Sequence, residues 1–93
     1  MEIMPPIQAS PEAAENLVNR LARIEGQVRG VRRMLEEGRD CQDILQQLAA
    51  VRSAVRQVSL VLVRSYACEC LARQDESPED MADTLIEALT RLP

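Results

Sequence analysis

The sequence predicts an all-α protein in which two long antiparallel helices and a short third helix form one protomer. Two observations carry this prediction. Hydrophobic residues make up 46% of the 93-residue chain but aromatic residues only 1%, with Tyr66 as the one ring, a composition typical of packed helices rather than of a sheet. Apolar residues also recur at alternating steps of four and three along two stretches, which is the spacing of an a/d helical seam.

The first helix is expected to open at Ser10-Pro11, a capping residue followed by proline at the first helical position, and to end at Gly38. Regular helix is expected nearer Asn16. We therefore assign residues 1–15 to a flexible N-terminal tail and residues 16–93 to a single helical domain. The apolar seam of this helix consists of Leu17, Leu21, Ile24, Val28, Val31 and Leu35.

The second helix is expected to start at Asp40, with Asp43 three residues later in an arrangement that resembles a capping box, and to run to about Arg73. Its seam consists of Ile44, Leu48, Val51, Val55, Val58 and Leu62. Ser77-Pro78-Glu79 repeats the Ser-Pro-Glu start signal, so a short third helix is expected after it. Its apolar residues are Met81, Leu85, Ala88, Leu89 and Leu92.

The two long helices predict an oligomer. Helices of about 25 and 33 residues span roughly 38 and 50 Å, which is longer than a compact domain of this size is wide. Folded into a hairpin, they leave apolar surface that one chain cannot cover. We therefore expect two protomers to pair into an antiparallel four-helix bundle.

The composition excludes several classes of function. The chain has no histidine, the commonest general base and a frequent ligand of zinc, nickel and cobalt, so we do not expect an enzyme. No apolar run approaches the ~20 residues that cross a bilayer, and the first fifteen residues lack the features of a signal peptide. We expect a cytoplasmic protein without membrane contact. In that compartment, three cysteines are more typical of free thiols, metal ligands or redox sensors than of disulfides.

Cys41 and Cys70 lie at opposite ends of the second helix. Cys41 is in the first turn, where free N–H groups and the positive end of the helix dipole favour a thiolate. Cys70 follows 29 residues later, roughly 43 Å away, so the two thiols can meet only between subunits. If antiparallel copies of this helix place Cys41 opposite Cys70 of the partner subunit, the two-fold axis falls between Val55 and Arg56. The alternative is that both are ordinary buried cysteines.

Two neighbours of Cys70 are less suited to that chemistry. Cys68 is about 200° around the helix from Cys70 and faces away from it, so the pair is a poor chelate. Tyr66 shares a face with Cys70, but a phenol is not a useful ligand for soft metals.

The charge of the chain is unevenly placed. The formal net charge is −4, yet residues 16–64 carry nine arginines against five acids. Several arginines have an acid four residues away, and three such pairs are expected to form ion pairs: Arg29 with Glu25, Arg32 with Glu36 and Arg33 with Glu37.

Four other arginines combine two features, because none has an acid three or four residues away and each has a second arginine at that spacing: Arg20, Arg23, Arg52 and Arg56. Their like-charged neighbours mildly destabilise the helices, which favours an external anion such as DNA phosphate as their partner. The alternative is an exposed arginine face without a partner.

The segments RLARIEGQVRGVRRMLEEGRDCQDILQQLAAVRSAV and SYACECL resemble the copper-sensitive operon repressor family, over roughly residues 16–92. The resemblance implies dimers of helical hairpins that pair into tetramers, bind operator DNA without a helix-turn-helix, and release it when the inducer arrives. It also implies a DNA-contacting arginine at Arg20, while Arg56 and Gln57 compete for a second position.

The copper sensors of this family use a Cys-His-Cys set, which falls here on Cys41, Tyr66 and Cys70. Because Tyr66 replaces the histidine, the chain is more similar to the persulfide-sensing branch. That likeness implies no cofactor and a persulfide or polysulfide inducer whose sulfane sulfur is attacked by Cys41. Cys70 of the partner subunit then resolves the product into a disulfide, trisulfide or longer bridge.

Two alternatives remain open. One is a Cu(I)-responsive repressor that binds the metal through Cys41 and Cys70, and the other is a helical scaffold that does not bind DNA.

Overall fold

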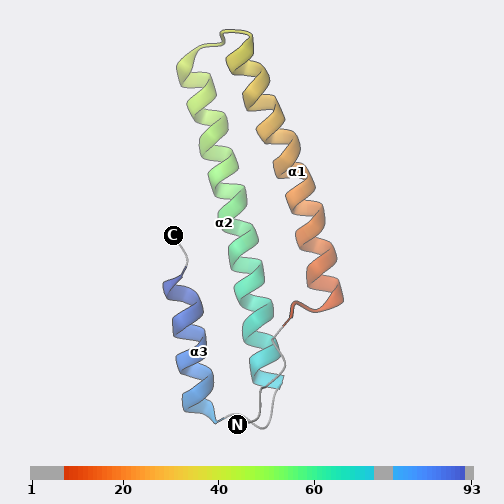
Figure 1. Cartoon of the computed structure of the whole chain (residues 1–93), viewed down its shortest axis with the longest axis vertical. Coiled ribbons are helices and arrows are strands. Elements are labelled where there is room, and N and C mark those ends of the chain that lie inside the picture. Colours follow the sequence, from red (N-terminus) through yellow and green to blue (C-terminus); the bar gives the residue numbers. More distant parts are fainter. Residues whose placement is uncertain (1–7, 73–76, 92–93) are drawn as a thin grey trace.

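The computed structural model describes residues 8–72 and 77–91, which form three helices. Helix α1 spans Pro11–Glu36, α2 spans Cys41–Ala72 and α3 spans Pro78–Thr90. Helices α1 and α2 form a long antiparallel hairpin, and the shorter α3 runs beside the part of α2 that is near its C-terminal end (Figure 1). No strand occurs among the described residues, so the predicted all-α class is confirmed.

Helix α1 begins where its capping residue predicts. The Ser10 hydroxyl accepts a hydrogen bond from the Ala13 backbone N–H at 3.2 Å, and Pro11 takes the first helical position, where a missing N–H costs nothing. Residues 11–15 are therefore helical, and their assignment to a flexible tail was wrong. The first residues of that tail lie outside the described part of the chain.

The turn between α1 and α2 is closed by Gly38. This residue has φ 68°, in the left-handed region that glycine adopts without strain. Its N–H donates to the Leu35 carbonyl at 3.2 Å, and the Arg39 N–H donates to the Met34 carbonyl at 2.9 Å, which is a Schellman motif. The predicted end of the first helix is confirmed.

The other two helix starts also use their predicted caps. An Asp40 carboxylate oxygen accepts from the Gln42 N–H at 3.1 Å, and the Ser77 hydroxyl accepts from the Asp80 N–H at 3.1 Å. Helix α2 is described to Ala72, so the predicted end near Arg73 lies outside the described residues. The apolar side chains that were predicted for α3 also fall outside them.

The hairpin core uses every seventh residue of each helix. On α1 the buried side chains are Leu17, Ile24 and Val31. On α2 the matching line begins with buried Ile44, continues through half-buried Val51 and Val58, and ends at buried Ser65. The Ser10 N–H donates to the Ser65 hydroxyl oxygen at 3.4 Å and sets the register. Counted from that contact, each core residue of α1 lies opposite a core residue of α2.

The other half of each predicted seam stays exposed. On α2, Leu48, Val55 and Leu62 are 45%, 46% and 47% exposed. The apolar face of the hairpin is the strip formed by these six exposed residues: Leu21, Val28, Leu35, Leu48, Val55 and Leu62. Each predicted seam is therefore only half buried within the protomer, because only every second residue of the seam contacts the other helix.

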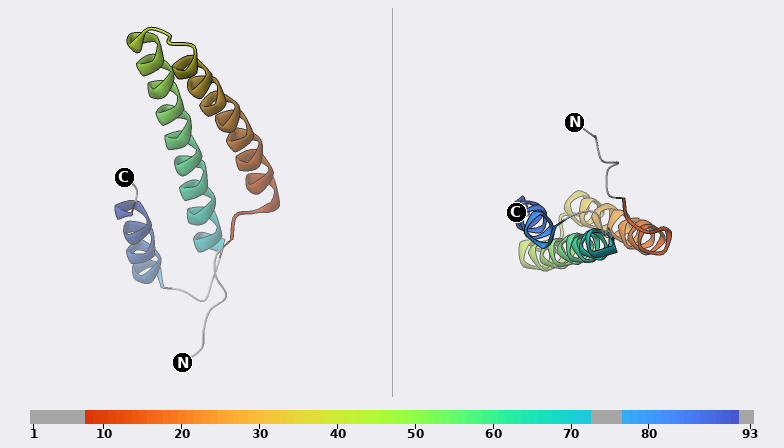
Figure 2. Two further views of the ribbon diagram at one scale, coloured as in Figure 1. Left: turned by 45° about the horizontal axis from the view of Figure 1, so that its top comes forward. Right: turned by 90° about the horizontal axis from the view of Figure 1, so that it is seen from below.

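All six exposed residues lie on one side of the hairpin. Most of them precede a core residue by three positions, which turns them about 60° to the same side of the seam. Antiparallel helices are related by a two-fold axis normal to the hairpin plane, so this side is one face for both helices. Leu62 lines a groove between α2 and α3, so α3 packs against α2 at the lower end of this face, and Figure 2 shows α3 beside α2 on the side away from α1.

No helix in the described part of the chain is long and apolar enough to cross a membrane.

Candidate functional site

Cys41 is the first residue of α2 and is exposed to solvent. The Asp40 cap places it directly after the turn, among the backbone N–H groups that have no partner within the helix. A thiol in this position is accessible to a solute without any movement of the chain. The structure thus places one predicted sensing residue at an open helix end.

Cys70 has the opposite environment. It lies in the last turn of α2 and its exposed fraction is 0%. The two thiols are separated by 29 residues of one helix, roughly 43 Å at 1.5 Å per residue. The structure therefore does not bring Cys41 and Cys70 together within one protomer, and the predicted bridge between subunits stays a prediction.

Cys68 is exposed while Cys70 is buried. Two positions on a helix are about 200° apart, so the two side chains point to different sides of α2. The expectation that Cys68 faces away from Cys70 agrees with this placement.

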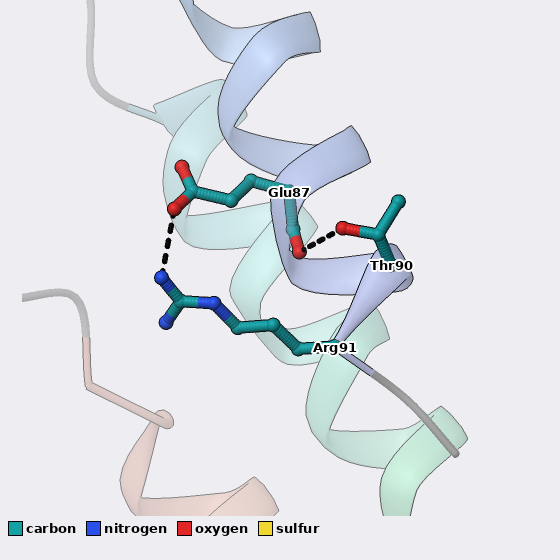
Figure 3. A network of polar contacts seen from close by, with 3 residues as sticks. All are labelled: Glu87, Thr90 and Arg91. Atoms are coloured by element: carbon teal, nitrogen blue, oxygen red, sulfur yellow. Dashed lines mark hydrogen bonds and ion pairs between the residues drawn. The ribbon is translucent and has the colours of Figure 1, made fainter.

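Tyr66 lines a groove between α2 and α3, one helical turn from Cys70. The groove has a volume of about 380 Å³ and is formed by Ser59, Leu62, Val63, Tyr66, Thr84, Glu87 and Arg91. On α3, the Arg91 guanidinium and the Glu87 carboxylate form an ion pair at 2.8 Å, and the Thr90 hydroxyl donates to the Glu87 carbonyl at 2.8 Å (Figure 3). This groove was not predicted from the sequence, in which the spacing of Glu87 and Arg91 signals an ion pair on α3 but not the groove itself.

The positions that the resemblance assigns to metal ligands hold two thiols and a phenol, those of Cys41, Cys70 and Tyr66. No three His, Cys, Asp or Glu residues gather into a metal-binding group among the described residues. Thiolates suit Cu(I), but the Tyr66 phenol does not. The donor set fits Cu(I) only when a second chain brings its own Cys41 to Cys70.

The structure separates the four candidate arginines. Arg23 directly precedes the core residue Ile24 and Arg20 precedes it by four positions, which turns both away from the apolar face. Arg52 directly follows a core position and is turned toward the apolar face. Arg56 lies about 160° from the seam, on the outer edge of α2. All four are exposed.

The predicted ion pairs form at one of three positions. Arg32 and Glu36 lie 3.6 Å apart, whereas Arg29 and Arg33 make no ion pair with any described residue. Both members of each missing pair are exposed, so water competes for them. The Arg20 Nε also donates a hydrogen bond to the Asn16 Oδ1 at 2.6 Å, which was not predicted from the sequence.

Comparisons with known proteins agree with this architecture. The family model described as metal-sensitive transcriptional repressor matches residues 13–91. The copper-sensing transcriptional repressor CsoR of Bacillus subtilis (strain 168) is 46% identical over 63 residues, which are 68% of this chain. The matched segment spans 62% of that repressor's length.

Two solved structures are similar over nearly the whole chain. The nickel-responsive transcriptional regulator InrS has a TM-score of 0.78 and 37% identity, covering 96% of this chain and 98% of its own. The copper-sensing repressor CsoR with Cu(I) from Geobacillus thermodenitrificans NG80-2 has a TM-score of 0.76 and 38% identity, covering 96% and 92%. With a family match over residues 13–91, this chain belongs to the family of metal-sensitive transcriptional repressors.

Proposed function

We propose that the chain is a DNA-binding transcriptional repressor that acts as a homo-oligomer and is switched by a link between Cys41 and Cys70 of the partner subunit. One observation carries this proposal. The two thiols lie at opposite ends of one 32-residue helix, and a line of exposed apolar residues runs between them. A second, antiparallel copy of this helix would cover the part of that line that α3 leaves open and place each Cys41 beside the partner's Cys70.

The apolar face supports such an antiparallel pairing. Leu48, Val55 and Leu62 repeat every seven residues, the spacing of knobs-into-holes packing. Val55 is close to the midpoint between Cys41 and Cys70, so a two-fold axis there relates the two halves of the line. The dimer would be a four-helix bundle, and a pair of dimers would form the tetramer.

The different exposure of the two thiols suggests an order for the sulfur chemistry. The exposed Cys41 thiolate attacks the sulfane sulfur of a persulfide R–S–SH, forms Cys41–S–SH and releases R–S⁻. The thiolate of Cys70 of the partner subunit then attacks the Cys41 sulfur and expels HS⁻. The product is one disulfide, and the two electrons of the thiols leave on the released sulfide. Because Cys70 is buried in the protomer, it is shielded from meeting the donor first.

A direct experiment tests the switch in the reduced protein. Inorganic polysulfide is added, the link between residues 41 and 70 is detected by mass spectrometry, and binding to the DNA upstream of the chain's own gene is followed by fluorescence anisotropy. We expect the bridge to form and the DNA to be released. Cys41→Ser should abolish both effects. Operator binding that stays unchanged after the bridge has formed contradicts the proposal.

A second candidate is a Cu(I)-responsive repressor, which the likeness to copper-sensing repressors favours. The same two thiols would hold the ion, and Tyr66 would stay outside its ligand set. Competition with a Cu(I) chelator separates the candidates, because a two-thiolate site that cannot compete for the ion excludes copper sensing. A chain that does not bind its promoter at low salt is a helical scaffold instead.

A further inference from the structure

Arg64 of α2 has the same relation to the hairpin as Arg23 of α1. Arg23 directly precedes the core residue Ile24, and Arg64 directly precedes the core residue Ser65. Each side chain is therefore turned about 100° from the seam in the same sense. Because the helices are antiparallel, Arg23 and Arg64 therefore lie on the same face of the hairpin. This face is opposite the apolar face.

This second face also contains Arg20 and Gln57. Arg20 precedes Ile24 by four positions, and Gln57 directly precedes the core residue Val58. We call the exposed set Arg20, Arg23, Gln57 and Arg64 the basic face. The α2 residues that line the groove against α3 are Ser59, Leu62, Val63 and Tyr66, and none of them belongs to the basic face, so α3 leaves that face open.

The charge around the basic face is one-sided. Helix α2 has three arginines and no acid from residue 44 to residue 68, and α1 has Arg20 and Arg23 but no acid from residue 16 to residue 24. Arg23 and Arg64 make no ion pair with any described residue. Arg20 is held by a neutral group, because its Nε donates to Asn16, which leaves both Nη groups free to bind an anion.

The spacing of these arginines suits a nucleic-acid backbone. The contact between Ser10 and Ser65 places Arg64 about level with the start of α1, nine residues below Arg20, which is roughly 14 Å along the hairpin. Duplex DNA carries about one negative charge per 1.7 Å of its axis, so about eight phosphate charges fall within that length.

Arg52 and Arg56 lack this placement. Arg52 lies on the apolar face with Leu48 and Val55, where a second copy of the chain would cover it. Arg56 lies on the outer edge of α2. A nucleic acid that lies along Arg20 and Arg23 on α1 would contact Arg64 and Gln57 on α2. It would contact neither Arg52 nor Arg56.

We propose that Arg64, together with Arg20 and Arg23, binds the phosphate backbone of duplex DNA on the basic face, and that Arg52 does not take part. The inference rests on the proposed DNA-binding function and names the contribution of α2 to it. Gln57 lies between the arginines of the two helices and can donate its amide to the same backbone.

The test compares three single variants of the full-length reduced chain: Arg64→Ala, Arg23→Ala and Arg52→Ala. Their binding to the duplex upstream of the chain's own gene and to an unrelated duplex of equal length is measured between about 50 and 200 mM salt. We expect Arg64→Ala and Arg23→Ala each to lower the slope of log K against log salt by about one for every contacting protomer. Both duplexes should be weakened alike, because a phosphate contact reads no sequence.

Arg52→Ala is the matched control, an exposed arginine of the same helix on the opposite face, and its slope should equal that of the wild type. Arg64→Lys keeps the charge and should restore the slope, which excludes a folding defect as the cause. Light scattering confirms that all variants keep the same oligomeric state. A slope that falls in Arg52→Ala but not in Arg64→Ala overturns the inference and leaves DNA binding intact. A wild-type chain that binds neither duplex overturns the proposed function as well.

Discussion

The two faces of the α1–α2 hairpin differ in what they can bind. The apolar face exposes leucine and valine at heptad spacing and already holds α3, whereas the basic face exposes arginine and glutamine beside helix stretches without acids. The helical repeat is the same for both faces, so it does not explain why one is apolar and the other basic. The difference supports the proposal that one side of the hairpin serves assembly and the other binds DNA, which would let DNA bind without separating the subunits.

The largest effect is expected from a charge at the centre of the apolar face. Val55→Asp would place two carboxylates near each other at the proposed two-fold axis, where facing like charges cost several kcal/mol. We expect the dissociation constant of the dimer to rise at least about 100-fold. Light scattering across a concentration series measures it. Gln57→Asp adds the same charge on the basic face and should leave assembly intact, and equal loss in both variants would remove the distinction between the faces.

A smaller effect is expected from a cavity in the core between α1 and α2, which lies between the two faces. Ile24 is buried between the helices, so Ile24→Ala removes apolar contacts and leaves a cavity, at a cost of about 2–5 kcal/mol in unfolding free energy. Chemical denaturation followed by circular dichroism measures this loss. Gln27→Ala, an exposed change one turn away, should stay within about 0.5 kcal/mol of the wild type. Similar losses in the two variants would place the core elsewhere.

The smallest perturbation uses the cysteines as probes of the C-terminal end of α2. Cys41 and Cys68 are exposed and Cys70 is buried, so brief alkylation of the reduced native protein should label the first two. Cys70 should react only after denaturant is added. Peptide mass spectrometry with isotopically distinct reagents gives the labelled fraction at each site. Rapid native labelling of Cys70 would mean that its burial does not shield it from a sulfur donor.

Local signals in the sequence were sufficient to identify the capping residues at the three helix starts and at the end of α1. Ser10, Gly38, Asp40 and Ser77 act through their own hydrogen bonds or dihedral angles, which depend on neighbours a few residues away. The start of α1 was placed too late in the domain assignment, because the acidic first turn was not counted as helix despite its cap and proline.

The division of each seam could not be predicted in the same way. Ile24 and Leu21 belong to one seam and have similar side chains, yet one is buried and the other is half exposed. The choice depends on how the helices meet, which is a long-range contact. For the same reason, the local sequence pointed to Arg52 and not to Arg64 as a candidate for DNA binding. The burial of Cys70 likewise depends on the tertiary fold and not on any local motif.

The serine at the end of the core explains why the hairpin has one alignment. The turn at Gly38 fixes the register at one end of the hairpin, but a heptad repeat of leucines and valines alone does not distinguish one alignment from another shifted by seven residues. Ser65 interrupts that repetition, because its oxygen receives the Ser10 N–H and a shift would leave a buried polar group without this donor, at a cost of about 1–3 kcal/mol. The Ser65 hydroxyl thereby helps to fix the spacing between Arg64 on α2 and the arginines of α1.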